Sequence, residues 1–222
     1  MCLIRHLQQC ELATVTFNST NTTATITAKG FELVEGTTAN PLTIFVTSTC
    51  YDLLDLRSEL ADDLESHGHI VRLSDDWERF VVSAQTNSID TCLQNLAYCD
   101  VAVCILDRRY GPPLPKDSTY PGISATHAEL NYARKKQIPI FFYIRDRAED
   151  EYKQLQSNSK YKLNWVQNKW KKEWSKLVDY AFKLPEGVDY SNWRERFSTV
   201  VDLKKIVAKQ LDDYRKNQNR HG

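Results

Sequence analysis

A glutamate and a histidine lie two residues apart in the segment GISATHAEL, which covers residues 122–130. The spacing of apolar residues predicts that a helix begins here, with Glu129 at the margin of its inner face, where a carboxylate needs a partner or a function. The pattern from Thr126 to Glu129 also fits a capping box, in which the Glu129 carboxylate binds the backbone N–H of Thr126. The local pattern leaves both interpretations open: a helix cap, or a carboxylate held for chemistry beside His127.

Hydroxyl and carboxylate side chains stand at the ends of two predicted strands. Thr47 and Ser48 end the apolar run TIFVTS, and Thr49 follows it directly before a predicted helix. Hydroxyl and free N–H groups at the start of a helix suit a phosphate or a ribose, although Thr49 or Asp52 could instead cap that helix. Asp75 ends the second predicted strand, where it is either a polar lining residue or a turn aspartate.

A third predicted strand leads into a loop over residues 108–124. Loops of this length in a compact domain are usually functional or mobile. Arg109 could bind phosphate and Tyr110 could stack on a base, and Ser124 stands where the loop enters the next helix. The alternative for this strand end is a plain surface ion pair between Asp107 and Arg108.

Several familiar sites are missing from the sequence. The glycines form neither G-x-G-x-x-G nor G-x-x-x-x-G-K-[ST], which argues against a Rossmann dehydrogenase and a P-loop NTPase. There is no G-x-S-x-G nucleophile motif either. The six cysteines show no C-x-x-C spacing, so we expect reduced thiols and no metal site.

Strand-like and helix-like segments alternate from residue 41 onward. The apolar segments TIFVTS, HIVRLSD, DVAVCILD and IPIFFYIRD alternate with three segments of helical period. The order βαβαβαβ predicts an open, doubly wound α/β sheet, in which ligands bind outside the carboxyl ends of the strands. Beyond Asp146, apolar residues at spacings of three or four predict one long helix over 162–184. A last helix near 193–214 should pack back through Phe197, Val200, Val201 and Leu203.

The two ends of the chain and its composition complete this outline. Residues 1–40 alternate as in a β-hairpin, so we expect a hairpin extension at 1–40 and an α/β domain with added C-terminal helices at 41–222. A net charge of zero gives no electrostatic argument for nucleic acid. No apolar run reaches the ~18 residues of a membrane span, and the start lacks a secretory signal, so we expect a cytoplasmic protein without a membrane partner.

Three motifs together resemble a known family. They are the F-V-[ST]-S-T-x-x-D-L-x-x-x-R block at 45–57, D-x-x-V-x-x-x-x-x-R-Y-G at 100–111, and S-x-T-x-x-E-L at 124–130. Their order and spacing are similar to those of the uncharacterised-domain family numbered 4062. That TIR-like group is related to Toll/interleukin-receptor domains and, more distantly, to nucleoside deoxyribosyltransferases. Asp107 stands where such proteins commonly have a glycine, so the loop shape can differ here.

The resemblance implies a flavodoxin-like fold and, as in active relatives, cleavage of NAD at the nicotinamide–ribose bond. Glu129 matches the essential glutamate of those relatives, and NAD would be the substrate with no further cofactor. The implied substrate-binding residues are Thr47, Ser48, Thr49, Asp75, Arg109, Tyr110, Ser124 and His127. Relatives also suggest immune or anti-phage signalling and a homo-oligomer or a partner signalling protein. The alternatives are a non-catalytic interaction module and a nucleoside or nucleotide N-glycosidase or transferase that uses another base.

Overall fold

The computed structural model describes residues 13–17, 22–26, 41–82, 85–184 and 192–221. The chain divides into two units, one of Met1–Asn40 with Arg215–Gly222 and one of Pro41–Tyr214. In the first unit, β1 (Ala13–Phe17) pairs antiparallel with β2 (Thr22–Ile26), with Ala13 opposite Ile26. These are the strands expected of the N-terminal hairpin. The other residues of 1–40 lie outside the described ranges. The expectation that 1–40 is a separate extension therefore stays a prediction.

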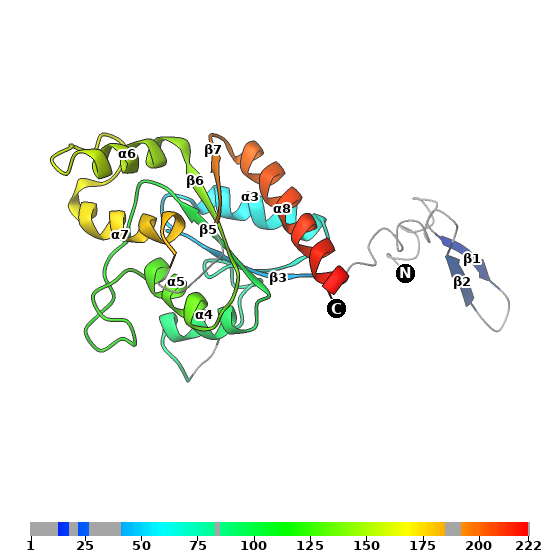
Figure 1. Cartoon of the computed structure of the whole chain (residues 1–222). Coiled ribbons are helices and arrows are strands. Elements are labelled where there is room, and N and C mark those ends of the chain that lie inside the picture. Colours follow the sequence, from blue (N-terminus) through cyan, green and yellow to red (C-terminus); the bar gives the residue numbers. More distant parts are fainter. Residues whose placement is uncertain (1–12, 18–21, 27–40, 83–84, 185–191, 222) are drawn as a thin grey trace. The chain divides into compact units, whose positions relative to one another are not determined.

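A five-stranded parallel sheet forms the centre of the second unit (Figure 1). Its strands are β3 (Thr43–Thr47), β4 (Ile70–Arg72), β5 (Val101–Leu106), β6 (Ile140–Arg145) and β7 (Trp193–Phe197), in the order β4-β3-β5-β6-β7. The chain moves outward from β3 to β4 and then returns to build the other half from β5. This arrangement confirms the predicted doubly wound α/β fold, and its switch point lies between β3 and β5.

Helices cover both faces of the sheet because alternate strand residues point to opposite sides. Ile44 and Val46 face α3 (Leu54–Ser66) and α8 (Val200–His221), while Phe45 packs towards α4 (Ser88–Ala97) and α5 (Ala125–Lys135). Farther along, β6 contacts α6 (Asp146–Ser157) and α7 (Lys171–Phe182). All six residues of β5 are buried, as expected for a central parallel strand covered on both sides. Among the described helices, none is long and apolar enough to cross a membrane.

The segment from Trp193 to Phe197 is a strand, so the prediction of a single helix from 193 to 214 was wrong at its start. This strand, β7, pairs with β6 from Phe141 opposite Trp193 to Arg145 opposite Phe197. Its sequence WRERF gives no apolar run because β7 lies at an edge and exposes most of its side chains. The helix begins only at Val200, and Val201 points to solvent instead of packing on the sheet.

The prediction of one long helix over 162–184 was also wrong. Only Lys171–Phe182 is α-helical, after a short 3₁₀ turn at Asn168–Trp170. The Glu151 carboxylate accepts hydrogen bonds from the backbone N–H groups of Asn164, Trp165 and Val166 at 2.5, 2.7 and 2.7 Å. These donors are therefore bound outside any helix. The spacing of apolar residues resembled that of one helix because Leu163 and Val166, which precede α7, pack in the same core cluster as the buried residues of α7.

Candidate functional site

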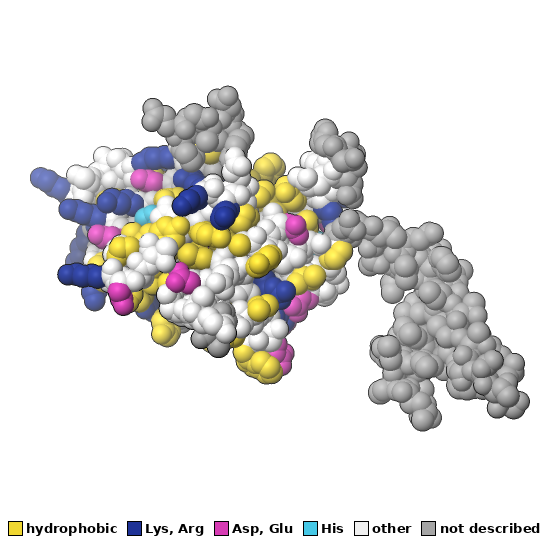
Figure 2. Space-filling model, turned by 90° about the horizontal axis from the view of Figure 1, so that it is seen from below, with side chains coloured by type: hydrophobic (Ala, Val, Ile, Leu, Met, Phe, Trp, Pro, Cys, Tyr) yellow, Lys and Arg dark blue, Asp and Glu magenta, His cyan; other side chains and the backbone are white. Residues whose placement is uncertain are grey.

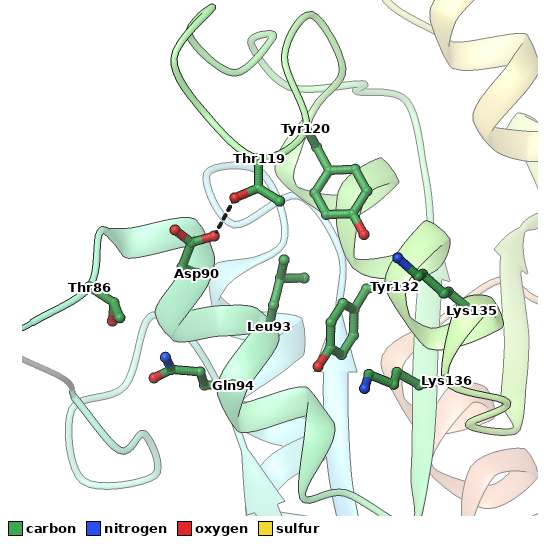
Figure 3. Close-up of a pocket in the computed structure, with 9 residues that line it drawn as sticks. All are labelled: Thr86, Asp90, Leu93, Gln94, Thr119, Tyr120, Tyr132, Lys135 and Lys136. Carbon is green, nitrogen blue, oxygen red and sulfur yellow. Dashed lines mark hydrogen bonds between the residues drawn. The ribbon is translucent and has the colours of Figure 1, made fainter.

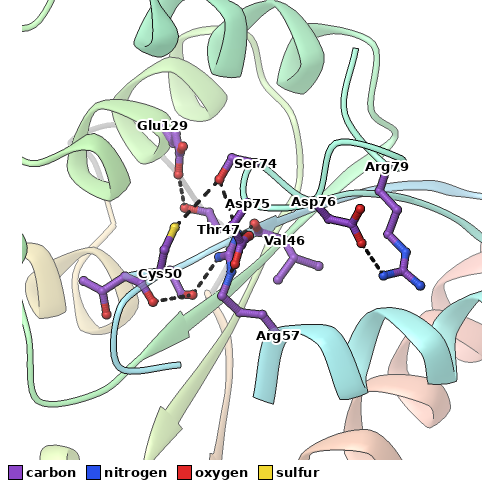
Figure 4. Close-up of polar contacts among 11 residues, drawn as sticks. Val46, Thr47, Cys50, Arg57, Ser74, Asp75, Asp76, Arg79 and Glu129 are labelled. Atoms are coloured by element: carbon purple, nitrogen blue, oxygen red, sulfur yellow. Dashed lines mark hydrogen bonds and ion pairs between the residues drawn. The ribbon is translucent and has the colours of Figure 1, made fainter. Parts of the chain in front are cut away.

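Glu129 lies inside α5 and faces the sheet, not the start of its own helix. The N-cap of α5 is Ser124, whose hydroxyl oxygen accepts a hydrogen bond from the His127 N–H at 3.3 Å. Thr126 is thus already in the first turn, and the capping box predicted as an alternative is wrong. The Glu129 carboxylate instead accepts a hydrogen bond from the Thr47 hydroxyl at the end of β3 (Figure 4). Only 5% of Glu129 is exposed.

The surroundings of Glu129 set its protonation near neutral pH. Burial raises the pKa of the Glu129 carboxyl to about 7, while the Thr47 hydrogen bond and the positive Arg57 guanidinium oppose that rise. The negative charge of Asp75 adds to it. Both the acid and the carboxylate are therefore populated at neutral pH, as suits a group that stabilises charge or handles a proton during a reaction.

Arg57, on α3, binds side chains that follow β3 and β4, close enough to Glu129 to lower its pKa. Its guanidinium binds the Asp75 carboxylate at 2.6 Å and 3.0 Å, donates to the Ser48 hydroxyl at 2.8 Å, and reaches the Ser74 hydroxyl at 3.3 Å. The Arg57 side chain is only 1% exposed. Arg57 belongs to the motif at 45–57 but was not among the predicted site residues. Its place on the inner face of the predicted helix, where a charged side chain needs a partner, could have indicated its role. We call Thr47, Ser48, Arg57, Asp75 and Glu129 the strand-end site.

Asp52 lies beside the strand-end site as a second buried carboxylate. Its side chain is 2% exposed and accepts a hydrogen bond from the Thr49 hydroxyl at 2.7 Å. Its other oxygen, Oδ2, forms no hydrogen bond within the described part of the chain. The N-cap of α3 is Leu53, so the predicted capping of that helix by Thr49 or Asp52 is wrong. Arg109 approaches the same carboxylate, with Nε 4.0 Å from Oδ1.

Three more predicted residues bind one another instead of facing a ligand. The buried Tyr110 hydroxyl accepts a hydrogen bond from the Ser124 N–H at 3.2 Å and lies 2.9 Å from His127 Nδ1. Because the Tyr110 ring belongs to the core, the structure contradicts its predicted role in stacking on a base. These contacts fix the loop to the start of α5. Gly111 follows with φ +86°, and a Cβ there would lie 3.8 Å from Thr49 Cγ2, so the two strand-end loops meet at this point.

Asp107 is a structural residue at the end of β5. Its carboxylate binds Arg145 Nε at 2.8 Å and Trp165 Nε1 at 2.9 Å. Its carbonyl oxygen accepts a hydrogen bond from Trp174 Nε1 at 2.8 Å. The predicted surface ion pair between Asp107 and Arg108 was therefore wrong, since Asp107 is buried and already bound.

The fold thus brings together Glu129, Thr47, Ser48 and Asp75, with Thr49 and Arg109 around the neighbouring Asp52. The arrangement combines a carboxyl that titrates near neutrality with a hydroxyl partner and a buried guanidinium. Such a set can stabilise a positively charged sugar and bind its hydroxyl groups. Among the described residues, no group of three His, Cys, Asp or Glu side chains is placed to hold a metal ion.

A family model matches most of the sequence, and solved structures resemble the chain. The sequence model of a family described as "Domain of unknown function (DUF4062)" matches residues 43–212. A structure titled "Structure of Clostridium botulinum CMP N-glycosidase, BcmB" is similar with a TM-score of 0.39 and 15% sequence identity, over 78% of this chain and 98% of that one. No curated protein matches the sequence.

Proposed function

The chain belongs to the DUF4062 family, as its three motifs predict, and we propose that it cleaves the N-glycosidic bond of a nucleotide at the strand-end site. The observation that carries this proposal is the buried Glu129 carboxyl, bound by Thr47 at the carboxyl end of β3. NAD is the first substrate we propose, with cleavage between nicotinamide and ribose. The choice of NAD rests on the resemblance of the three motifs to TIR-like domains.

The proposed reaction needs a negative charge beside the sugar. When the bond from C1′ to the nicotinamide nitrogen breaks, its electron pair stays on the nitrogen and nicotinamide leaves as a neutral molecule. The ribose becomes an oxocarbenium-like cation, which the ionised Glu129 stabilises. Water then adds to C1′ and releases a proton. Because the pKa of Glu129 is about 7, the fraction in the active, ionised form increases through neutral pH.

The surrounding side chains supply contacts for the rest of the nucleotide. We propose that Ser48, Thr49 and Asp52 Oδ2, which accepts no hydrogen bond in the described ranges and has Arg108 Nε 3.9 Å away, bind ribose hydroxyls, and that Arg109 binds phosphate. Arg109 is half-exposed, and its ion-pair distance to Asp52 is 4.0 Å, so its side chain can move at small cost. The mobility of Arg109 matters because Glu129 is only 5% exposed. A substrate can reach Glu129 only when the side chains that cover it move aside.

The direct test is release of nicotinamide from NAD by the purified chain, followed by chromatography. We propose assays over a wide range of protein concentrations, since self-association completes the active site in many TIR-like enzymes. Wild type should release nicotinamide, and Glu129→Gln should reduce the rate by at least a hundredfold. Glu149→Gln is the matched control, because Glu149 is another buried helical glutamate but lies outside the strand-end site. Equal rates for wild type and Glu129→Gln would refute the assignment.

A nucleotide with a different base is the alternative within the same chemistry. The same assay with ribonucleotides and deoxyribonucleotides, together with their nucleosides, separates the two cases. Release of a purine or pyrimidine base, with NAD left intact and the activity lost in Glu129→Gln, would replace NAD in the proposal. A role in immune or anti-phage signalling and a cytoplasmic location are further proposals that rest on relatives and on sequence alone.

A second candidate function is assembly without catalysis. It is favoured by four exposed apolar side chains around the end of β4 and α4, with Trp77 81% and Tyr98 84% exposed and Val81 and Val82 also open to solvent. Surfaces of this kind often mark an interaction site. Inactivity on every substrate together with concentration-dependent self-association, lost in Trp77→Ser by sedimentation, would support this function over the enzyme.

A further inference from the structure

A groove of about 510 Å³ lies between α4 and α5, beneath the loop that precedes α5 (Figure 3). Leu93 and Asp90 come from α4, Tyr120 from the loop, Tyr132 and Lys135 from α5, and Lys136 from the C-cap of α5. The groove shares no residue with the strand-end site. Figure 2 shows the face of the molecule on which α4 and α5 lie, with hydrophobic side chains gathered across it and lysine and arginine side chains around them.

The walls of the groove are held in place by the protein itself. The Thr119 hydroxyl donates to Asp90 Oδ1 at 2.8 Å, which fastens the loop to the first turn of α4. Within the loop, the Leu114 N–H donates to the Ile123 carbonyl at 2.8 Å. Tyr120 and Ile123 pack with residues of α4 and α5 in one apolar cluster. The groove is therefore a built feature and not a gap beneath a loose segment.

The charges around the groove are unbalanced in favour of an anion. Both oxygens of Asp90 are already bound, Oδ1 by Thr119 and Oδ2 by the Asn87 side-chain amide at 2.6 Å. In contrast, neither Lys135 nor Lys136 forms an ion pair with a carboxylate anywhere in the described ranges. Two ammonium groups without a carboxylate partner thus lie at one side of the groove and favour a ligand with negative charge.

The same side of the groove offers aromatic surface. Tyr120 and Tyr132 are half-buried, and Figure 3 shows the two lysine side chains extending beside their rings. Lys136 Nζ lies 5.8 Å from the centroid of the Tyr132 ring. Tyrosine rings and the Leu93 side chain bind a flat ring by stacking and apolar contact. The volume lies within the range of small-molecule sites.

We propose that this groove is a binding site for a small ligand that joins a flat aromatic ring to a phosphate, of the class of a 5′-mononucleotide. The ring lies against Tyr120 and Tyr132, and the phosphate binds Lys135 and Lys136. This site is distinct from the strand-end site, because none of the residues that line the groove belongs to that site and the Glu129 carboxylate binds Thr47 at the end of β3.

The test is calorimetric titration of the full chain with 5′-AMP, with adenosine and inorganic phosphate as partial probes. Wild type should bind 5′-AMP at least tenfold more tightly than either partial probe. Lys135→Gln/Lys136→Gln should weaken that binding at least tenfold, and Tyr120→Ala should weaken it several-fold. Lys169→Gln/Lys172→Gln is the matched control, since it removes two exposed lysines from the region of α7 and should leave the affinity unchanged.

Titration of Glu129→Gln separates the two sites and prevents turnover of the probe. Its affinity for 5′-AMP should equal that of wild type. Absence of 5′-AMP binding in wild type would overturn the proposal. So would unchanged affinity in the Lys135/Lys136 variant, and so would loss of affinity in Glu129→Gln alone, which would assign the binding to the strand-end site. All four lysines are exposed, so far-ultraviolet circular dichroism should show wild-type folding in both lysine variants.

Discussion

Replacement of Glu129 by glutamine should stabilise the protein at alkaline pH, even though it removes the residue proposed to act in catalysis. The pKa of the carboxyl is about 7 in the folded chain, against a reference value of 4.5. Between these two values the folded chain keeps a proton that the unfolded chain has released. The free energy of unfolding therefore falls as pH rises from 4.5 to about 7, and the loss is complete above that window.

The size of the effect follows from the interval between the two pKa values. Each pKa unit corresponds to about 1.36 kcal/mol, so the interval corresponds to roughly 3 kcal/mol at pH 8. Glutamine has no proton to lose, and its side-chain oxygen can still accept the hydrogen bond from Thr47. Glu129→Gln should thus equal wild type near pH 4.5 and exceed its free energy of unfolding by roughly 3 kcal/mol at pH 8. Other titrating groups change equally in both proteins and cancel in the difference.

Urea denaturation followed by circular dichroism, at several pH values from 4.5 to 8, measures this difference. Glu149→Gln serves as the control, because Glu149 is also buried in a helix but is paired with Lys153 at 2.6 Å, so its replacement should not stabilise the protein at pH 8. A difference between wild type and Glu129→Gln that does not change with pH would refute the reasoning. So would a Glu129→Gln variant less stable than wild type at pH 8.

Four other expectations follow from the same contacts. NAD cleavage should increase with pH through about 7, and Thr47→Val should move the midpoint of this profile upward, because it removes a hydrogen bond that holds the pKa of Glu129 down. Arg57→Met should lower the free energy of unfolding by about 3 to 5 kcal/mol in urea titrations, since it leaves a carboxylate partner without its cation. Ser124→Ala should cost about 1 kcal/mol by the same measurement, through loss of the N-cap of α5. Gly111→Ala should lower the free energy of unfolding by about 1 to 2 kcal/mol, because the φ of +86° at this position disfavours a side chain. A lower thermal midpoint would show this loss.

The central elements could be predicted from sequence because burial on both faces leaves a continuous apolar run. VAVCIL, which forms β5, is the clearest example. The edge strand β7 could not be predicted in the same way, since its pairing uses backbone groups on one side and its side chains are exposed. Main-chain hydrogen bonds of this kind leave little trace in residue type.

The candidate site was predictable as a set of residues but not as a set of contacts. Glu129 and Thr47 were each predicted, yet they are 82 residues apart, and only the fold shows that they bind each other. The capping-box pattern could not be rejected earlier because the same four residues fit either helix register. Tyr110 was misjudged because an aromatic residue at a strand end looks the same in sequence whether its ring is buried or exposed.

The position of β7 decides where this chain can be cut. The three motifs end by residue 130 and the fourth predicted strand by residue 146, which suggests a minimal fragment of 41–146 for expression. Such a fragment would lack β7 and leave the backbone groups of β6 unpaired along Phe142 and Ile144, both fully buried in the complete chain. An open apolar edge of that kind recruits other chains and leads to aggregation. A shortened protein for crystallisation or screening therefore has to retain the sequence through α8, whatever is removed before residue 41.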